Sequence, residues 1–174
     1  MIRCSLQAIS RVPAVVDYTF YDASGLKILE TKDDVIQTSI ASAFRELPII
    51  PYTLSLIDAD GNEGFSLKKK TVVTQTAPAF TLDFPEGSVD FLEDRERFSL
   101  PNTSFHYRGK RYDITGFVRA RTFYIKRGDE VLASYKGKLI AGGKEYEITV
   151  ESGELPLPVY LATAIVLDVF FHNY

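Results

Sequence analysis

Polar and apolar residues alternate along much of the chain, which is the pattern of half-buried β-strands. Val16, Tyr18 and Phe20 alternate with polar neighbours, and a turn sequence at residues 22–25 precedes a returning strand. The same order recurs over residues 52–67 and 123–135, and a last alternating segment follows the turn at Gly142 and Gly143. Successive hairpins with Asp- or Gly-bearing turns predict an antiparallel meander.

Two segments break the alternation. Asp33 or Asp34 can cap a short helix that ends before Pro48. The apolar face of this helix would comprise Ile36, Ile40, Phe44 and Leu47. Residues 88–100 mix acidic and basic side chains without a clear period, so we predict a loop or an irregular strand there.

The end of the chain has a different pattern. Residues 158–171 predict a helix of about 21 Å that is apolar on every face, with Pro158 in its first turn. Such a helix must be surrounded by lipid or by protein. Residues 155–171 are the only candidate membrane segment, but two prolines and Asp168 interrupt it and it falls short of the roughly 20 residues that span a bilayer. We therefore expect protein to surround the helix.

Asp168 is the one charged residue inside this apolar segment. A buried carboxylate needs hydrogen-bond partners or access to water. We interpret Asp168 as a carboxylate near the helix end that accepts hydrogen bonds or reaches water, in preference to a functional acid.

Composition bounds the class of protein. The chain has 174 residues, of which 45% are hydrophobic and 25% charged, and no linker divides it. We predict a single domain over residues 1–174, with residues 1–14 as an N-terminal extension and 158–171 as a central helix. The formal charge of −3 gives no reason to expect a nucleic-acid partner.

The inventory of metal-binding and redox side chains is small. Cys4 is the only cysteine, and His106 and His172 are the only histidines, which excludes an internal disulfide and argues against the usual zinc sites. We expect no cofactor and no metal. Without a recognisable signal peptide, we predict a cytoplasmic monomer that can associate peripherally with a membrane.

Motifs that would indicate catalysis are missing from the sequence. It has no G-x-G-x-x-G, P-loop, G-x-S-x-G or H-E-x-x-H motif. We interpret His106 as an ordinary strand residue rather than a general base. The acids at residues 58–63 fit a hairpin turn better than a calcium loop, because the glycine comes too early and no distal glutamate follows.

Basic residues concentrate in residues 104–138. This segment has nine lysines and arginines against three acids, a local charge of +6 in a chain of total charge −3. Alternation along one unbroken strand would place Arg111, Arg119 and Arg121 on one face, with Lys136 and Lys138 on a face of a following strand. Such a face can bind phosphate or lipid headgroups, or it can serve solubility alone.

The order of strand motifs resembles a known superfamily. The motifs are Tyr112-Asp113-Ile114-Thr115-Gly116, Phe123-Tyr124-Ile125, Val131-Leu132-Ala133-Ser134, Gly143-Lys144-Glu145-Tyr146-Glu147-Ile148 and the apolar run over 160–168. Over residues 79–174 the chain resembles the tubby C-terminal-like superfamily, in particular the bacterial LURP-one-related proteins and, more distantly, the phospholipid scramblases. The resemblance implies a closed antiparallel barrel of about twelve strands around a buried C-terminal helix. We expect the small residues Gly116 and Ala120 to face that helix.

The resemblance also implies a function. Tubby-like relatives that bind phosphoinositides suggest a non-catalytic module that recognises anionic lipid headgroups or another anionic ligand through a basic sheet face, here with Arg111, Arg119, Arg121, Lys136 and Lys138. The alternatives are a protein-interaction or stress-response domain without a small ligand and a hydrolase that uses His106.

Overall fold

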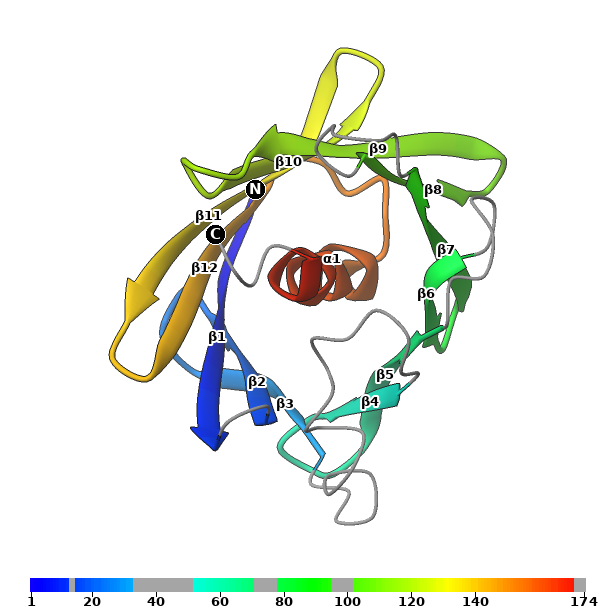
Figure 1. Ribbon diagram of the computed structural model, residues 1–174. Helices are drawn as coiled ribbons and strands as arrows, with labels where there is room; N and C mark the ends of the chain where they lie inside the picture. Colours follow the sequence, from blue (N-terminus) through cyan, green and yellow to red (C-terminus); the bar gives the residue numbers. More distant parts are fainter. Residues whose placement is uncertain (13–14, 33–51, 71–77, 95–101, 171–174) are drawn as a thin grey trace.

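The computed structural model describes residues 1–12, 15–32, 52–70, 78–94 and 102–170, which form twelve strands and one helix (Figure 1). The strands are β1 (Ile2–Val12), β2 (Val15–Asp22), β3 (Lys27–Thr31), β4 (Tyr52–Ile57), β5 (Glu63–Lys69), β6 (Pro78–Phe84), β7 (Gly87–Asp94), β8 (Asn102–Tyr107), β9 (Lys110–Phe117), β10 (Thr122–Arg127), β11 (Glu130–Ile140) and β12 (Gly143–Val150). The helix is α1 (Leu157–Phe170).

The strands close into a barrel. Each strand pairs antiparallel with the next, and β1 pairs with both β2 and β12, so that Leu6 lies between Phe20 and Tyr146. Closure satisfies the backbone groups that an open sheet would leave at its edges. The predicted architecture, a closed antiparallel barrel of about twelve strands around a C-terminal helix, is confirmed.

The alternation in the sequence separates the inside of the barrel from the outside. On β4, Tyr52, Leu54 and Leu56 are buried, whereas Thr53 and Ser55 between them are half-buried on the outer face. Leu54 and Leu56 face Leu67 and Phe65 across the β4–β5 pair, and those two side chains are also buried. Period-2 alternation therefore reports which face of each strand contacts the core.

Helix α1 lies along the middle of the barrel (Figure 1). Every residue from Val159 to Asp168 is buried, which explains why the helix is apolar on all faces. The Tyr135 hydroxyl on β11 donates a hydrogen bond to the Tyr160 carbonyl at 2.9 Å. The helix begins one residue before the predicted start, and the predicted last residue, Phe171, lies outside the described residues.

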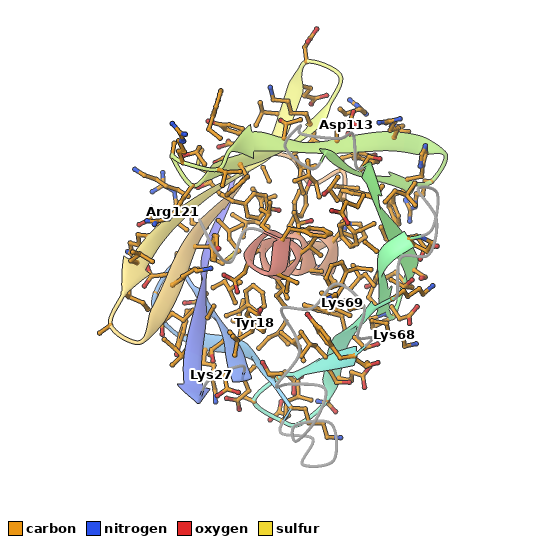
Figure 2. The ribbon with its side chains drawn as sticks, in the orientation of Figure 1. Tyr18, Lys27, Lys68, Lys69, Asp113 and Arg121 are labelled. Atoms are coloured by element: carbon orange, nitrogen blue, oxygen red, sulfur yellow. The ribbon has the colours of Figure 1, made fainter. Side chains whose placement is uncertain are left out.

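The carboxyl end of α1 is held by Asp168, which is 1% exposed. Its carboxylate accepts hydrogen bonds from the hydroxyls of Tyr18 on β2 and Tyr146 on β12, at 3.1 and 2.9 Å. The Lys144 ammonium donates to the same carboxylate at 3.1 Å. Figure 2 shows Tyr18 inside the barrel. The interpretation of Asp168 as a carboxylate that accepts hydrogen bonds near the helix end is confirmed.

The amino end of α1 is held by a second carboxylate. Glu154, three residues before the helix, accepts hydrogen bonds from Lys110 at 2.7 Å, from the Tyr112 hydroxyl at 3.1 Å and from Arg127. Its pKa is lowered, first by the hydrogen bond from Lys110. Burial, with the neighbouring carboxylate, raises the pKa of Tyr112 to about 12. The two carboxylates thus fix α1 to the barrel wall at both ends.

Two segments that were not predicted as regular strands belong to the barrel. Residues 2–12, predicted as part of an extension, form β1, because Cys4, Leu6 and Ala8 face the interior. Residues 87–94 form the regular strand β7, which pairs with β6 and β8, against the predicted loop or irregular strand. Its period is unclear in the sequence because Glu93 is buried although it is charged. The predicted helix near residues 34–47 and residues 95–100 lie outside the described residues.

Candidate functional site

The predicted unbroken strand through Arg111 and Arg121 is interrupted. Strand β9 ends at Phe117, and residues 118–121 form a turn before β10. The Arg121 amide donates to the Val118 carbonyl at 3.0 Å and closes this turn. Arg121 adopts a φ of 49°, a left-handed conformation that is uncommon outside glycine. Ala120 is exposed in this turn, so its predicted position facing the helix is wrong.

The turn lies against β11 and brings four of the predicted basic residues into one region. The Gly137 amide donates to the Arg121 carbonyl at 2.7 Å, and Lys136 and Lys138 flank Gly137 in the chain. Arg119 is exposed in the turn, and both lysines are exposed on β11. We call Arg119, Arg121, Lys136 and Lys138 the cationic rim. It lies at the end of the barrel where α1 finishes. Strands β9 and β11 both end there, and Lys144, at the adjoining start of β12, contacts Asp168 near the end of α1.

Gly137 makes the close approach of the turn possible. A Cβ atom there would lie 3.1 Å from the Tyr146 ring and 3.2 Å from the Arg121 Cβ. Any larger residue would therefore press on both neighbours. Gly137 thus lies against both the Arg121 Cβ and the ring of Tyr146, the residue that donates a hydrogen bond to Asp168.

Arg111 does not belong to the cationic rim. It is the second residue of β9, opposite His106 on β8, and lies six residues before Phe117, about 20 Å along an extended strand. Its guanidinium forms an ion pair with Asp113 at 3.0 Å. Figure 2 shows Asp113 on the β9 side of the barrel, away from Arg121 beside β11. The predicted five-residue face is therefore a group of four residues and one separate residue.

The members of the cationic rim differ in their ion pairs. Lys138 lies 2.7 Å from Glu145 and 3.4 Å from Glu147, and these carboxylates, Glu145 first, raise its pKa. In the part of the chain that the structure describes, Arg119, Arg121 and Lys136 form no ion pair. Four cations and two carboxylates leave a local charge of +2. Lys138 is therefore neutralised by its carboxylate partners, and the charges of Arg119, Arg121 and Lys136 remain available to an anionic ligand.

An exposed aromatic residue lies beside these cations. Phe117, the last residue of β9, is 69% exposed. It pairs with Thr122 on β10, which in turn pairs with Lys136 on β11, so the three residues form one row across the outer face. Phe117 was not predicted as a site residue from the sequence. The alternation could have indicated its outward position, because the inward residues Tyr112 and Ile114 are even-numbered and Phe117 is odd-numbered.

The other candidates from the sequence lie elsewhere. His106 is exposed on the outer face of β8, opposite Arg111. Cys4 is buried, and burial raises the pKa of its thiol to about 11. The Asp58 carboxylate accepts hydrogen bonds from the amides of Asp60 and Asn62, both at 2.9 Å, so it stabilises its own hairpin turn.

Two further findings apply to the described residues. They contain no group of three or more His, Cys, Asp or Glu side chains that could hold a metal ion. None of their helices has both the length and the apolar character required to cross a bilayer.

Comparison of the chain with protein-family models, with curated proteins and with solved structures gives no match.

Proposed function

We propose that the chain is a non-catalytic binding module that associates with anionic lipid surfaces through the cationic rim. The observation that carries the proposal is that three cations without ion pairs among the described residues lie close to the exposed Phe117 in the fold: Lys136 in its cross-strand row, and Arg119 and Arg121 in the turn that follows it. Basic side chains close together attract phosphate and carboxylate headgroups, and guanidinium groups can bind phosphate with two hydrogen bonds.

The expected strength follows from the number of available charges. Each basic residue near an anionic membrane contributes about 1 kcal/mol, so three contribute about 3 kcal/mol. A millimolar dissociation constant corresponds to about 4 kcal/mol. The attraction between charges alone is therefore weak, and it should decrease as salt shortens the Debye length from about 10 Å at 0.1 M.

Vesicle co-sedimentation tests the proposal. The protein should sediment with phosphatidylserine-containing vesicles and not with phosphatidylcholine vesicles, and rising salt should release it. The double variant Arg119→Glu/Lys136→Glu should lose binding because it reverses two rim charges.

A matched double variant controls for net charge. Arg108→Glu/Arg111→Glu makes the same change, from −3 to −7, at exposed residues near the other end of β9. It should bind like the wild type. Equal loss in both variants would show that only net charge matters, and failure of the wild type to bind at low salt would overturn the proposal and leave the protein-interaction alternative ahead.

A further inference from the structure

Phe117 differs from the other phenylalanines that the structure describes. Those residues are buried in the core or, in the case of Phe170, half-buried against it. Phe117 occupies a regular strand position on the outer face, where Thr115 and Asp113 precede it in the same phase. Single exposed apolar residues are common on protein surfaces, so exposure alone carries little information.

The exposed ring of Phe117 lies close to basic residues. Lys136 lies in its cross-strand row, and Arg119 and Arg121 follow in the adjoining turn. A membrane interface favours this combination, because an aromatic ring can enter between headgroups while basic side chains contact their phosphates. A purely aqueous anionic ligand would use the cations and leave the ring in water.

We infer that Phe117 inserts into the interface of an anionic bilayer, so that the barrel docks through the β9–β10 turn, at the end where α1 finishes. This inference rests on the proposed function and adds the residue that enters the lipid and the orientation of the barrel. Removal of an inserted phenylalanine should weaken vesicle binding about tenfold or more.

The sequence allows a direct test, because the chain contains no tryptophan. Phe117→Trp places a single indole at the docking position. Its emission should shift to the blue with phosphatidylserine-containing vesicles, stay unchanged with phosphatidylcholine vesicles, and be quenched by lipids with brominated acyl chains.

Leu26 provides a matched control position. It is 66% exposed, close to the value for Phe117, but lies in the β2–β3 turn at the opposite end of the barrel. Leu26→Trp should bind the same vesicles without a shift in emission. A second variant, Phe117→Ser, should bind more weakly while its urea unfolding midpoint stays at the wild-type value.

The outcomes separate the inference from the proposed function. Vesicle binding by the Phe117→Trp variant without a blue shift of its indole emission would overturn the inference and leave the cationic rim as a purely electrostatic site. An equal shift in the Phe117→Trp and Leu26→Trp variants would overturn the docking orientation. Absence of binding by the wild type would overturn both proposals.

Discussion

The Asp168 carboxylate accepts a hydrogen bond from the Tyr146 hydroxyl at 2.9 Å inside the barrel, at the carboxyl end of an otherwise apolar helix. Burial first, and the charge of Asp168 second, raise the pKa of Tyr146 well above its ordinary value. The tyrosine therefore stays protonated and remains a donor. Lys144 brings the compensating positive charge to the same oxygen atom of the carboxylate.

We predict that Asp168→Asn lowers the free energy of unfolding by about 3 kcal/mol. The reason is that the substitution removes a buried carboxylate charge that lies 3.1 Å from the Lys144 ammonium, whose side chain is largely buried. The double variant Asp168→Asn/Lys144→Met should recover part of the loss. Urea unfolding of the three proteins measures both effects, and a change below about 0.5 kcal/mol in the single variant would contradict the structural role of the pair.

We predict that Ala164→Arg prevents folding. Ala164 is fully buried in the middle of α1, where a guanidinium would be removed from water. Asp168, one helical turn further along, already accepts hydrogen bonds from two tyrosine hydroxyls and from Lys144. The expected cost is comparable with the whole stability of a domain, about 5 kcal/mol or more. Ala23→Arg adds the same charge in the exposed β2–β3 turn and should melt like the wild type. A cooperative melt of Ala164→Arg near the wild-type temperature would show that α1 is not central to the fold.

The hairpins and the central helix could be predicted because their signals are strong and local. Alternation gives the inward face of β4 directly, and an apolar run such as 159–167 can only be a surrounded helix. The same reasoning failed at residues 118–121. That turn contains Val118, Arg119, Ala120 and Arg121 and none of the Gly, Pro, Asn or Asp residues that usually indicate a turn.

The error at this turn changed the candidate site. A continuous strand would have placed Arg111, Arg119 and Arg121 on one face, whereas the turn moves the last two beside β11. The hydrogen bond from the Gly137 amide to the Arg121 carbonyl holds the turn beside β11. A local sequence pattern cannot predict this contact, because the two residues are 16 positions apart in the chain. Composition identified the basic segment, but only the register of β9, β10 and β11 shows which charges lie together.

We predict that Gly116→Ala lowers the free energy of unfolding by about 2 kcal/mol. A Cβ atom there would lie 2.7 Å from the Phe123 Cα and in contact with the Thr122 carbonyl, so β9 and β10 would have to separate. Gly153→Ala is the matched control, because no atom lies within 4 Å of a Cβ at that position. Chemical denaturation should show a loss only for Gly116→Ala. Equal stability of the two variants would mean that the β9–β10 pair is looser than the structure indicates.

We predict that Glu154 contributes to the acid sensitivity of the fold. Its pKa is lower in the folded protein than its ordinary value of 4.5, chiefly because Lys110 donates a hydrogen bond to the carboxylate. As the pH falls below about 4.5, the unfolded chain therefore takes up a proton at this residue before the folded protein does. The stabilising contribution of Glu154 is complete above that pH and is lost as the pH falls through the folded pKa.

Glu154→Gln should reveal this contribution in urea unfolding midpoints measured between about pH 7 and pH 3. The variant should be less stable than the wild type near neutrality, because a neutral amide interacts more weakly with Lys110 and Arg127. It should also lose less stability on acidification. Some loss will remain, since hydrogen bonds lower the pKa values of Asp22 and Asp58 as well. Glu86→Gln, at an exposed carboxylate in the β6–β7 turn, should follow the wild-type profile. If the Glu154→Gln and wild-type profiles run parallel, the contacts of Glu154 position the helix without a net electrostatic contribution.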